Sequence, residues 1–183
     1  MPGQDSSFMW QGFIPQQENP HSKNPAQGFL ESANQRPADS TYPYFIPGSY
    51  ITPRGVTITN KLSAMSGITP DDMKKLQYDY FNTLAEDAVG ILLKYVRENE
   101  LDANGKKYLE VLRKWDLIAG PASTGQTVFQ TWWVSLEVEV WKDELTKVTP
   151  AANWPTEQTL MELLKKDTAM KFIDNINTSQ KET

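Results

Sequence analysis

The chain has 183 residues, no cysteine and a formal net charge of −5, with 39% hydrophobic residues and six tryptophans. This length and apolar content suit a folded protein of one domain, or one and a half, rather than a disordered chain. Without cysteine there are no disulfides, thiolate nucleophiles or cysteine metal sites, and the negative charge argues against a nucleic-acid partner. No apolar run approaches the roughly twenty residues of a membrane span, so we expect no membrane partner either.

The first 55 residues are rich in proline, since eight of the twelve prolines lie at or before Pro53. Proline fixes φ and removes a backbone donor, so this part is expected to consist of short strands and ordered loops. We predict strands at Gln11–Ile14 and Gly28–Ala33. Two short strands make at best a marginal sheet alone and need partners from elsewhere. The aromatic loop Tyr42–Pro47 is expected to pack on the helical part.

After residue 55 the apolar pattern becomes helical. A short helix is predicted at Gly55–Met65. The next begins with Thr69 as N-cap and Pro70 at its first position, and one apolar face continues to about Val96, the spacing of a helix packed on a core. The residues on that face are Met73, Leu76, Tyr80, Leu84, Ala88, Ile91 and Tyr95.

Three further helices are predicted in the rest of the chain, at Lys106–Trp115, at Val128–Leu145 and from Pro155 onward. The middle one contains a strand-like alternation, but about eighteen residues without a turn signal are long for a strand. Phe172 and Ile173 are expected to pack in a tail. The expected fold is therefore mainly α, with a helical domain over residues 56–183 preceded by a short Pro-rich β-containing arm over residues 1–55.

The sequence offers few of the residues that a catalytic triad, a glycosidase pair or a metal site would need. His21 is the one histidine, in a Pro-rich loop where a solvated surface residue is more usual than a catalytic base. The acids Glu18, Asp39 and Asp71 with Asp72 form no evident glycosidase pair, because two of them are placed to cap a helix. One histidine without cysteine does not indicate a metal site. No cofactor is predicted from these residues.

Asn34 stands at the end of the predicted strand Gly28–Ala33, shortly before Pro37, which cannot continue a ladder. An asparagine at a strand end can aim its amide N–H out of the sheet, where it is a suitable donor to an oxyanion. The alternative is that Asn34 only opens a turn, as asparagine does for local reasons. Its spacing alone leaves both interpretations open.

Four short motifs follow one another between residues 10 and 37. They are Trp10-Gln11-Gly12-Phe13-Ile14-Pro15, Glu18-Asn19-Pro20, Asn24-Pro25-Ala26-Gln27-Gly28 and Ala33-Asn34-Gln35-Arg36-Pro37. Their order resembles that of the penicillin acylase family of N-terminal-nucleophile hydrolases, which reads there W-x-G-x-I-P, E-x-P, N-P-x-x-G and A-N-N-x-P. Weaker matches continue through the chain to its end.

The resemblance implies that Asn34 lies in the oxyanion hole of an amidohydrolase acting on penicillin-type or other N-acyl amides. The family's nucleophile is a Ser, Thr or Cys whose own α-amino group is the base, and it lies far upstream of that Asn. Ser7 mimics the nucleophile's surroundings but stands too close to Asn34. The chain is therefore expected to be an interior segment of the large (β) subunit, inactive alone, with the remainder of the parent chain as its partner. A small-molecule amide is the parent's expected substrate.

The same resemblance implies a periplasmic or secreted location, although Met1–Asp5 carries no targeting segment. Two departures from the family pattern stand out. Arg54 matches the first Arg of R-x-x-R-I but Thr57 occupies the place of the second, and Ser49 is closest to an Asp that binds calcium in some members. Calcium is therefore not an expected cofactor. The other interpretation left open is a non-catalytic binding or interaction domain from a degenerate acylase relative.

Overall fold

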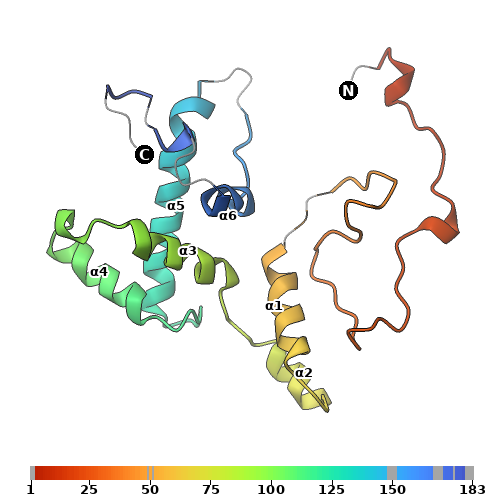
Figure 1. Cartoon of the computed structure of the whole chain (residues 1–183), viewed down its shortest axis with the longest axis horizontal. Coiled ribbons are helices and arrows are strands. Elements are labelled where there is room, and N and C mark those ends of the chain that lie inside the picture. Colours follow the sequence, from red (N-terminus) through yellow and green to blue (C-terminus); the bar gives the residue numbers. More distant parts are fainter. Residues whose placement is uncertain are drawn as a thin grey trace.

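A computed structural model describes residues 3–48, 50, 52–147, 152–166, 171–174 and 176–179. Within these residues the fold is mainly helical, as predicted, and no strand is present. The Pro-rich arm follows an extended path at one side of the molecule, and α1 and α2 lie between it and the other helices (Figure 1). The described helices are α1 (Thr52–Ser63), α2 (Pro70–Leu76), α3 (Thr83–Tyr95), α4 (Ala103–Lys114), α5 (Thr124–Leu145) and α6 (Glu157–Lys166).

The start of α2 follows directly from its sequence. Thr69 Oγ1 accepts the backbone N–H of Asp72 at 3.3 Å, and the Asp72 carboxylate accepts the N–H of Thr69 at 3.0 Å. These reciprocal bonds satisfy two backbone donors that a helix start leaves without a partner, and Pro70 lacks the donor that would have been a third. The predicted N-cap is confirmed.

The predicted continuous helix from Thr69 to Val96 is wrong, because the chain leaves the helix between α2 and α3. Asp79 Oδ1 accepts the N–H of Phe81, and Asn82 Oδ1 caps α3 by accepting the N–H of Ala85, both at 2.9 Å. Short polar side chains offer the backbone these alternatives to helical hydrogen bonds. The break leaves three residues of the expected apolar face exposed, namely Met73, Tyr80 and Tyr95.

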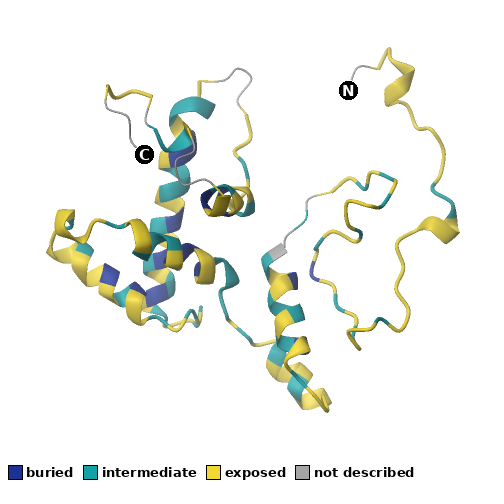
Figure 2. Cartoon of the chain, in the orientation of Figure 1, coloured by how far each residue is buried: buried dark blue, intermediate teal, exposed yellow. Residues whose placement is uncertain are grey.

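The core is built around α5, which the sequence correctly predicted as a helix. Figure 2 shows buried segments along its length, and α4 packs along it. Its fully buried side chains are Phe129, Trp133 and Trp141, and α3 contributes Ala85 and Ala88. The last helix and the tail close the core. They contribute Leu160, Met161 and Leu164 from α6 and the partly buried Phe172 and Ile173, which confirms the expected packing of the tail.

The strands predicted at Gln11–Ile14 and Gly28–Ala33 are absent, since both segments are extended or turn without a ladder. No segment of the described residues supplies a partner strand, and an unpaired strand is not stable in water. The loop Tyr42–Pro47 does not pack its aromatic rings on the helices. The hydroxyls of Tyr42 and Tyr44 instead bond Glu18 within the arm, and Phe45 is 82% exposed.

No helix of the described residues is both long and apolar enough to cross a membrane. The division into an arm of residues 1–55 and a helical domain of residues 56–183 stays a prediction.

Candidate functional site

Asn34 lies on the surface in a turn, with φ of 65°. This left-handed conformation is unfavourable for most side chains, but asparagine adopts it readily. The local geometry therefore fits the turn interpretation of Asn34. Several contacts attach this turn to α1, and these contacts define the direction of the Asn34 side chain.

The most informative of these contacts joins Asn34 to Arg54 in the first turn of α1. Arg54 Nη2 donates to Asn34 Oδ1 at 2.6 Å. A guanidinium group has donors only, so the carboxamide must turn its oxygen toward Arg54 and its NH₂ group away. Arg54 thus engages the oxygen of Asn34 and leaves Nδ2 as a donor with no hydrogen bond among the described residues.

A second set of bonds orders the turn and also attaches it to α1. Gln35 Oε1 accepts the N–H of Ala33 at 2.5 Å, and Gln35 Nε2 donates to Glu31 Oε1 at 2.6 Å. The same Glu31 oxygen accepts from Thr59 of α1 at 3.2 Å. A side chain at Gly55 would place its Cβ 3.0 Å from Gln35 Cδ, so this glycine allows α1 to approach the turn closely.

Thr57, which stands where the family pattern has an arginine, is used structurally. Its Oγ1 donates to the carbonyl oxygen of Pro53 at 3.0 Å and also bonds the hydroxyl of Thr83 at the start of α3. Thr57 therefore connects α1 to α3. Both hydrogen bonds of the Thr57 hydroxyl are made to other residues of this chain.

The remaining candidates, which are His21 and the acidic residues, do not come together as a catalytic group. His21 is exposed, and its Nδ1 lies 2.9 Å from the carbonyl oxygen of Asn19 in its own loop. Glu18 accepts from Tyr44, and Asp71 pairs with Lys74 at 3.1 Å. The Ser7 N–H donates to Asp5 at 2.9 Å in an exposed 3-10 turn. Each of these groups has a local structural role.

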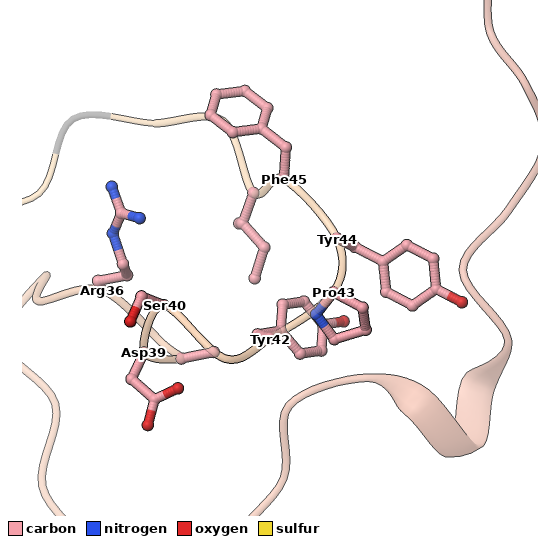
Figure 3. A pocket seen from close by; sticks show the side chains of 9 residues that line it. Arg36, Asp39, Ser40, Tyr42, Pro43, Tyr44 and Phe45 are labelled. Atoms are coloured by element: carbon pink, nitrogen blue, oxygen red, sulfur yellow. The ribbon is translucent and has the colours of Figure 1, made fainter.

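A shallow cavity of about 310 Å³ lies in the loop that contains Asp39 and the aromatic residues (Figure 3). Its one carboxylate, Asp39, accepts from both the N–H and the hydroxyl of Thr41, and these bonds lower the Asp39 pKa. Ser40 also lines this cavity, but no base contacts it among the described residues. The cavity therefore shows no hydrolytic arrangement.

No group of three or more His, Cys, Asp or Glu side chains within the described residues could hold a metal ion. Ser49, the position nearest to the family's calcium-binding Asp, lies outside the described residues.

Sequence reasoning found Asn34 and Arg54 as separate motif positions but not their contact. They are separated by the loop that returns to α1, and nothing in the residue pattern shows where such a loop ends in space.

Two comparisons with known proteins bear on this site. A protein-family model described as penicillin amidase matches residues 1–183 of the chain. No solved structure matches the chain. The family match covers both the Asn34 turn and the helices behind it.

Proposed function

This chain belongs to the penicillin amidase family, and we propose that it is a segment of an amidohydrolase in which Asn34 donates into the oxyanion hole. The observation that carries this proposal is the Arg54 bond to Asn34 Oδ1 at 2.6 Å, because it engages the amide oxygen and leaves the amide nitrogen as the group that can donate to a ligand. The motif around Asn34 supports the same assignment through its likeness to the family pattern.

The proposed chemistry is the hydrolysis of penicillin-type or other N-acyl amides. A hydroxyl nucleophile from the rest of the parent attacks the carbonyl carbon, and the carbonyl oxygen takes up the electron pair. Asn34 Nδ2 donates to that oxyanion, which is typically worth about 3 to 4 kcal/mol of barrier. The nucleophile's α-amino group takes the hydroxyl proton and passes it to the departing amine nitrogen. Water then hydrolyses the acyl ester.

The helical part has a proposed role as a cover over the substrate cleft. Its support is the direct attachment of α1 behind the Asn34 turn, through Arg54 and through Glu31 with Thr59. Thr57 and Thr83 extend that connection to α3. A cover attached in this way would move with the donor rather than independently of it.

The proposed partner is the remainder of the parent chain. Several large apolar side chains of the arm are exposed, among them Phe13 at 90% and Trp10 at 81%. Such a surface is typical of a segment that other protein covers. The proposed location, periplasmic or secreted, rests on the family resemblance. The same exposed aromatics also suit the alternative, a binding domain from a degenerate relative that does not cleave its ligand.

The test is Asn34→Ala in the full-length parent, assayed on chromogenic acyl amides. An oxyanion donor acts on the transition state, so kcat should fall roughly a hundredfold or more while KM stays nearly unchanged. Asn24→Ala is a matched control, because Asn24 is also exposed and has a positive φ of 50°.

The loss of one oxyanion donor typically lowers kcat far more than about threefold. If the kcat of Asn34→Ala stays within about threefold of wild type, Asn34 does not lie in the active site. If Asn34→Ala lowers stability but leaves the rate per folded molecule unchanged, the result favours the interpretation that Asn34 only forms a turn. A wild-type parent that binds these amides but hydrolyses none of them would support the non-catalytic alternative. The 183-residue chain alone should show no turnover.

A further inference from the structure

We infer that Glu31 is a positioning residue, which holds the Asn34 turn at a fixed place on α1 through its bonds to Gln35 and Thr59. This role rests on the proposed function, because a fixed turn affects the reaction only if Asn34 donates to the substrate. Glu31 lies outside the motif Ala33–Pro37 that carries Asn34. Its role therefore comes from its contacts alone.

The Glu31 carboxylate joins the turn to a residue of α1 that lies 28 positions further along the chain. Glu31 Oε1 accepts from Gln35 Nε2 at 2.6 Å and from Thr59 Oγ1 at 3.2 Å. Both bonds are partly buried, and the second carboxylate oxygen, Oε2, is shielded from solvent. Hydrogen bonds are stronger where water is excluded. One oxygen atom of Glu31 thus connects the turn to the helix.

Gln35 carries this connection to the backbone directly before Asn34. Gln35 Oε1 accepts the N–H of Ala33 at 2.5 Å, and Ala33 is only 7% exposed. The residues on both sides of Asn34 are therefore held, Ala33 by its backbone and Gln35 by its side chain. With both neighbours held, the Cα atom of Asn34 has little freedom to shift relative to α1.

Arg54 and Glu31 act on Asn34 in different ways. Arg54 donates to Asn34 Oδ1 and so determines which end of the carboxamide is engaged. Glu31 determines where the whole turn lies on α1. An oxyanion donor acts over about 2.7 to 3.1 Å, so a displaced turn loses this interaction even when its amide is correctly oriented. A displacement of about 1 Å can slow a reaction about a hundredfold.

Gly55 of α1 leaves the space that the Gln35 amide occupies. A Cβ at Gly55 would lie 3.0 Å from Gln35 Cδ and 3.1 Å from Gln35 Oε1. Since Glu31 and Ala33 hold this amide from both ends, it cannot move away without weakening a hydrogen bond. Alanine is also a better helix former than glycine. Gly55→Ala should therefore displace the turn without weakening α1.

The experiment measures kcat and KM per folded molecule in the full-length parent, on chromogenic acyl amides. Glu31→Met removes the acceptor at similar side-chain length, and it should lower kcat about tenfold with KM nearly unchanged. Glu31→Gln keeps an oxygen that can accept both bonds, so its kcat should stay within about threefold of wild type. Thr59→Val removes one of the two donors and should lower kcat less than Glu31→Met does. Ser63→Ala removes an exposed hydroxyl from the same helix and is the control.

Gly55→Ala should also lower kcat about tenfold. Its Tm should change little, because Ala33 is the one buried hydrophobic residue that the described part of the arm contributes. Gly90→Ala is the matched control, since Gly90 lies in α3 and nothing lies within 4 Å of a Cβ there. When Asn34→Ala is already present, Glu31→Met should change kcat by no more than about twofold, because no donor remains to be positioned.

The positioning role would be overturned if Asn34→Ala lowered kcat about a hundredfold while Glu31→Met and Gly55→Ala stayed within about threefold of wild type. The oxyanion assignment would then stand. An equal loss from Glu31→Met with and without Asn34 would also overturn the role, because Glu31 would then act by another route. If Asn34→Ala keeps nearly the full rate, the proposed function fails and the positioning role fails with it. If Glu31→Met does not fold, Gly55→Ala and Thr59→Val decide between the same outcomes.

Discussion

At position 125, in the first turn of α5, the absence of a side chain makes room for the indole of Trp115. A Cβ at this position would lie 2.2 Å from Trp115 Cγ and 2.7 Å from Trp115 Cβ. Neither atom is the far end of a flexible side chain, so the indole or the helix would have to shift. Gly125 therefore allows α5 to pack against the residue that ends α4.

Gly125→Ala should destabilise the chain by about 1 to 3 kcal/mol, the usual cost of overpacking a core. Gly90→Ala is the matched control. Gly90 is exposed within α3 and nothing lies within 4 Å of a Cβ there. Removing a glycine from a helix interior should stabilise the chain by about 0.5 to 1 kcal/mol. Urea unfolding measures both. Equal stabilisation by the two changes would contradict the packing of Trp115 on Gly125.

Glu137 on α5 supplies a pH-dependent effect. Burial and the neighbouring Glu157 raise the pKa of Glu137 from its ordinary value of 4.5. The folded state thus holds this proton more tightly than the unfolded state does. Stability is therefore lost as pH rises from the unfolded pKa through the folded pKa, and the loss is complete above that window.

Glu137→Gln should accordingly raise Tm at about pH 7, and the gain should disappear near pH 3, where both states carry the neutral acid. Thermal unfolding at the two pH values measures this. Glu139→Gln on the same helix is the control, because Glu139 is exposed and should change Tm little. A gain of equal size at both pH values would assign the effect to packing rather than to charge.

At the scale of elements, α6 depends on tertiary contact. It is a helix of 10 residues, and isolated helices of this length are marginal in water. Its stability comes from Leu160, Met161 and Leu164, which are buried in the common core. Contacts between α6 and α3 join the end of the chain to its middle.

Leu160→Ala should cost about 2 to 5 kcal/mol, because Leu160 is 0% exposed and its removal leaves a cavity. Leu163→Ala is the matched comparison on the same helix. Leu163 is only partly buried, so its loss should cost less. Denaturant unfolding with the m-value held constant gives both numbers. Equal costs would contradict the deeper burial of Leu160 relative to Leu163.

At the scale of the whole molecule, the described residues differ sharply in packing between the arm and the helices. The buried hydrophobic residues lie almost entirely in the helices, and Ala33 is the one from the arm. Within Phe29–Ala33, Ala33 is the residue whose N–H donates a bond inside the described part of the chain. Few buried contacts and few backbone hydrogen bonds indicate low local stability.

Hydrogen exchange should therefore be fast across residues 29–32 and slow across Ala85–Val89 and around Trp133. The measurement is exchange on a dilute monomer followed by mass spectrometry or NMR. Slow exchange at residues 29–32 would mean that these residues pair as a strand within the chain. Protection that appears only when the rest of the parent is present would support the proposed partner.

Features whose causes are local could be predicted from the sequence alone. Thr69, Pro70 and Asp72 are neighbours, so the start of α2 could be read from them directly. The length of residues 128–145 without a turn signal likewise sufficed to predict α5 as a helix, although part of this stretch alternates like a strand. The motifs around Asn34 indicated the family for the same reason, since each occupies a few consecutive residues.

Features that depend on contacts between distant residues could be known only from the three-dimensional fold. The break between α2 and α3 is set in part by Phe81 and Ile118, which form an antiparallel bridge. The orientation of the Asn34 amide depends on Arg54, which α1 brings to the turn from twenty residues further along the chain. A strand or a donor needs a partner whose position follows from the path of the whole chain. Residue patterns therefore located Asn34, while the fold determined which way its amide group faces.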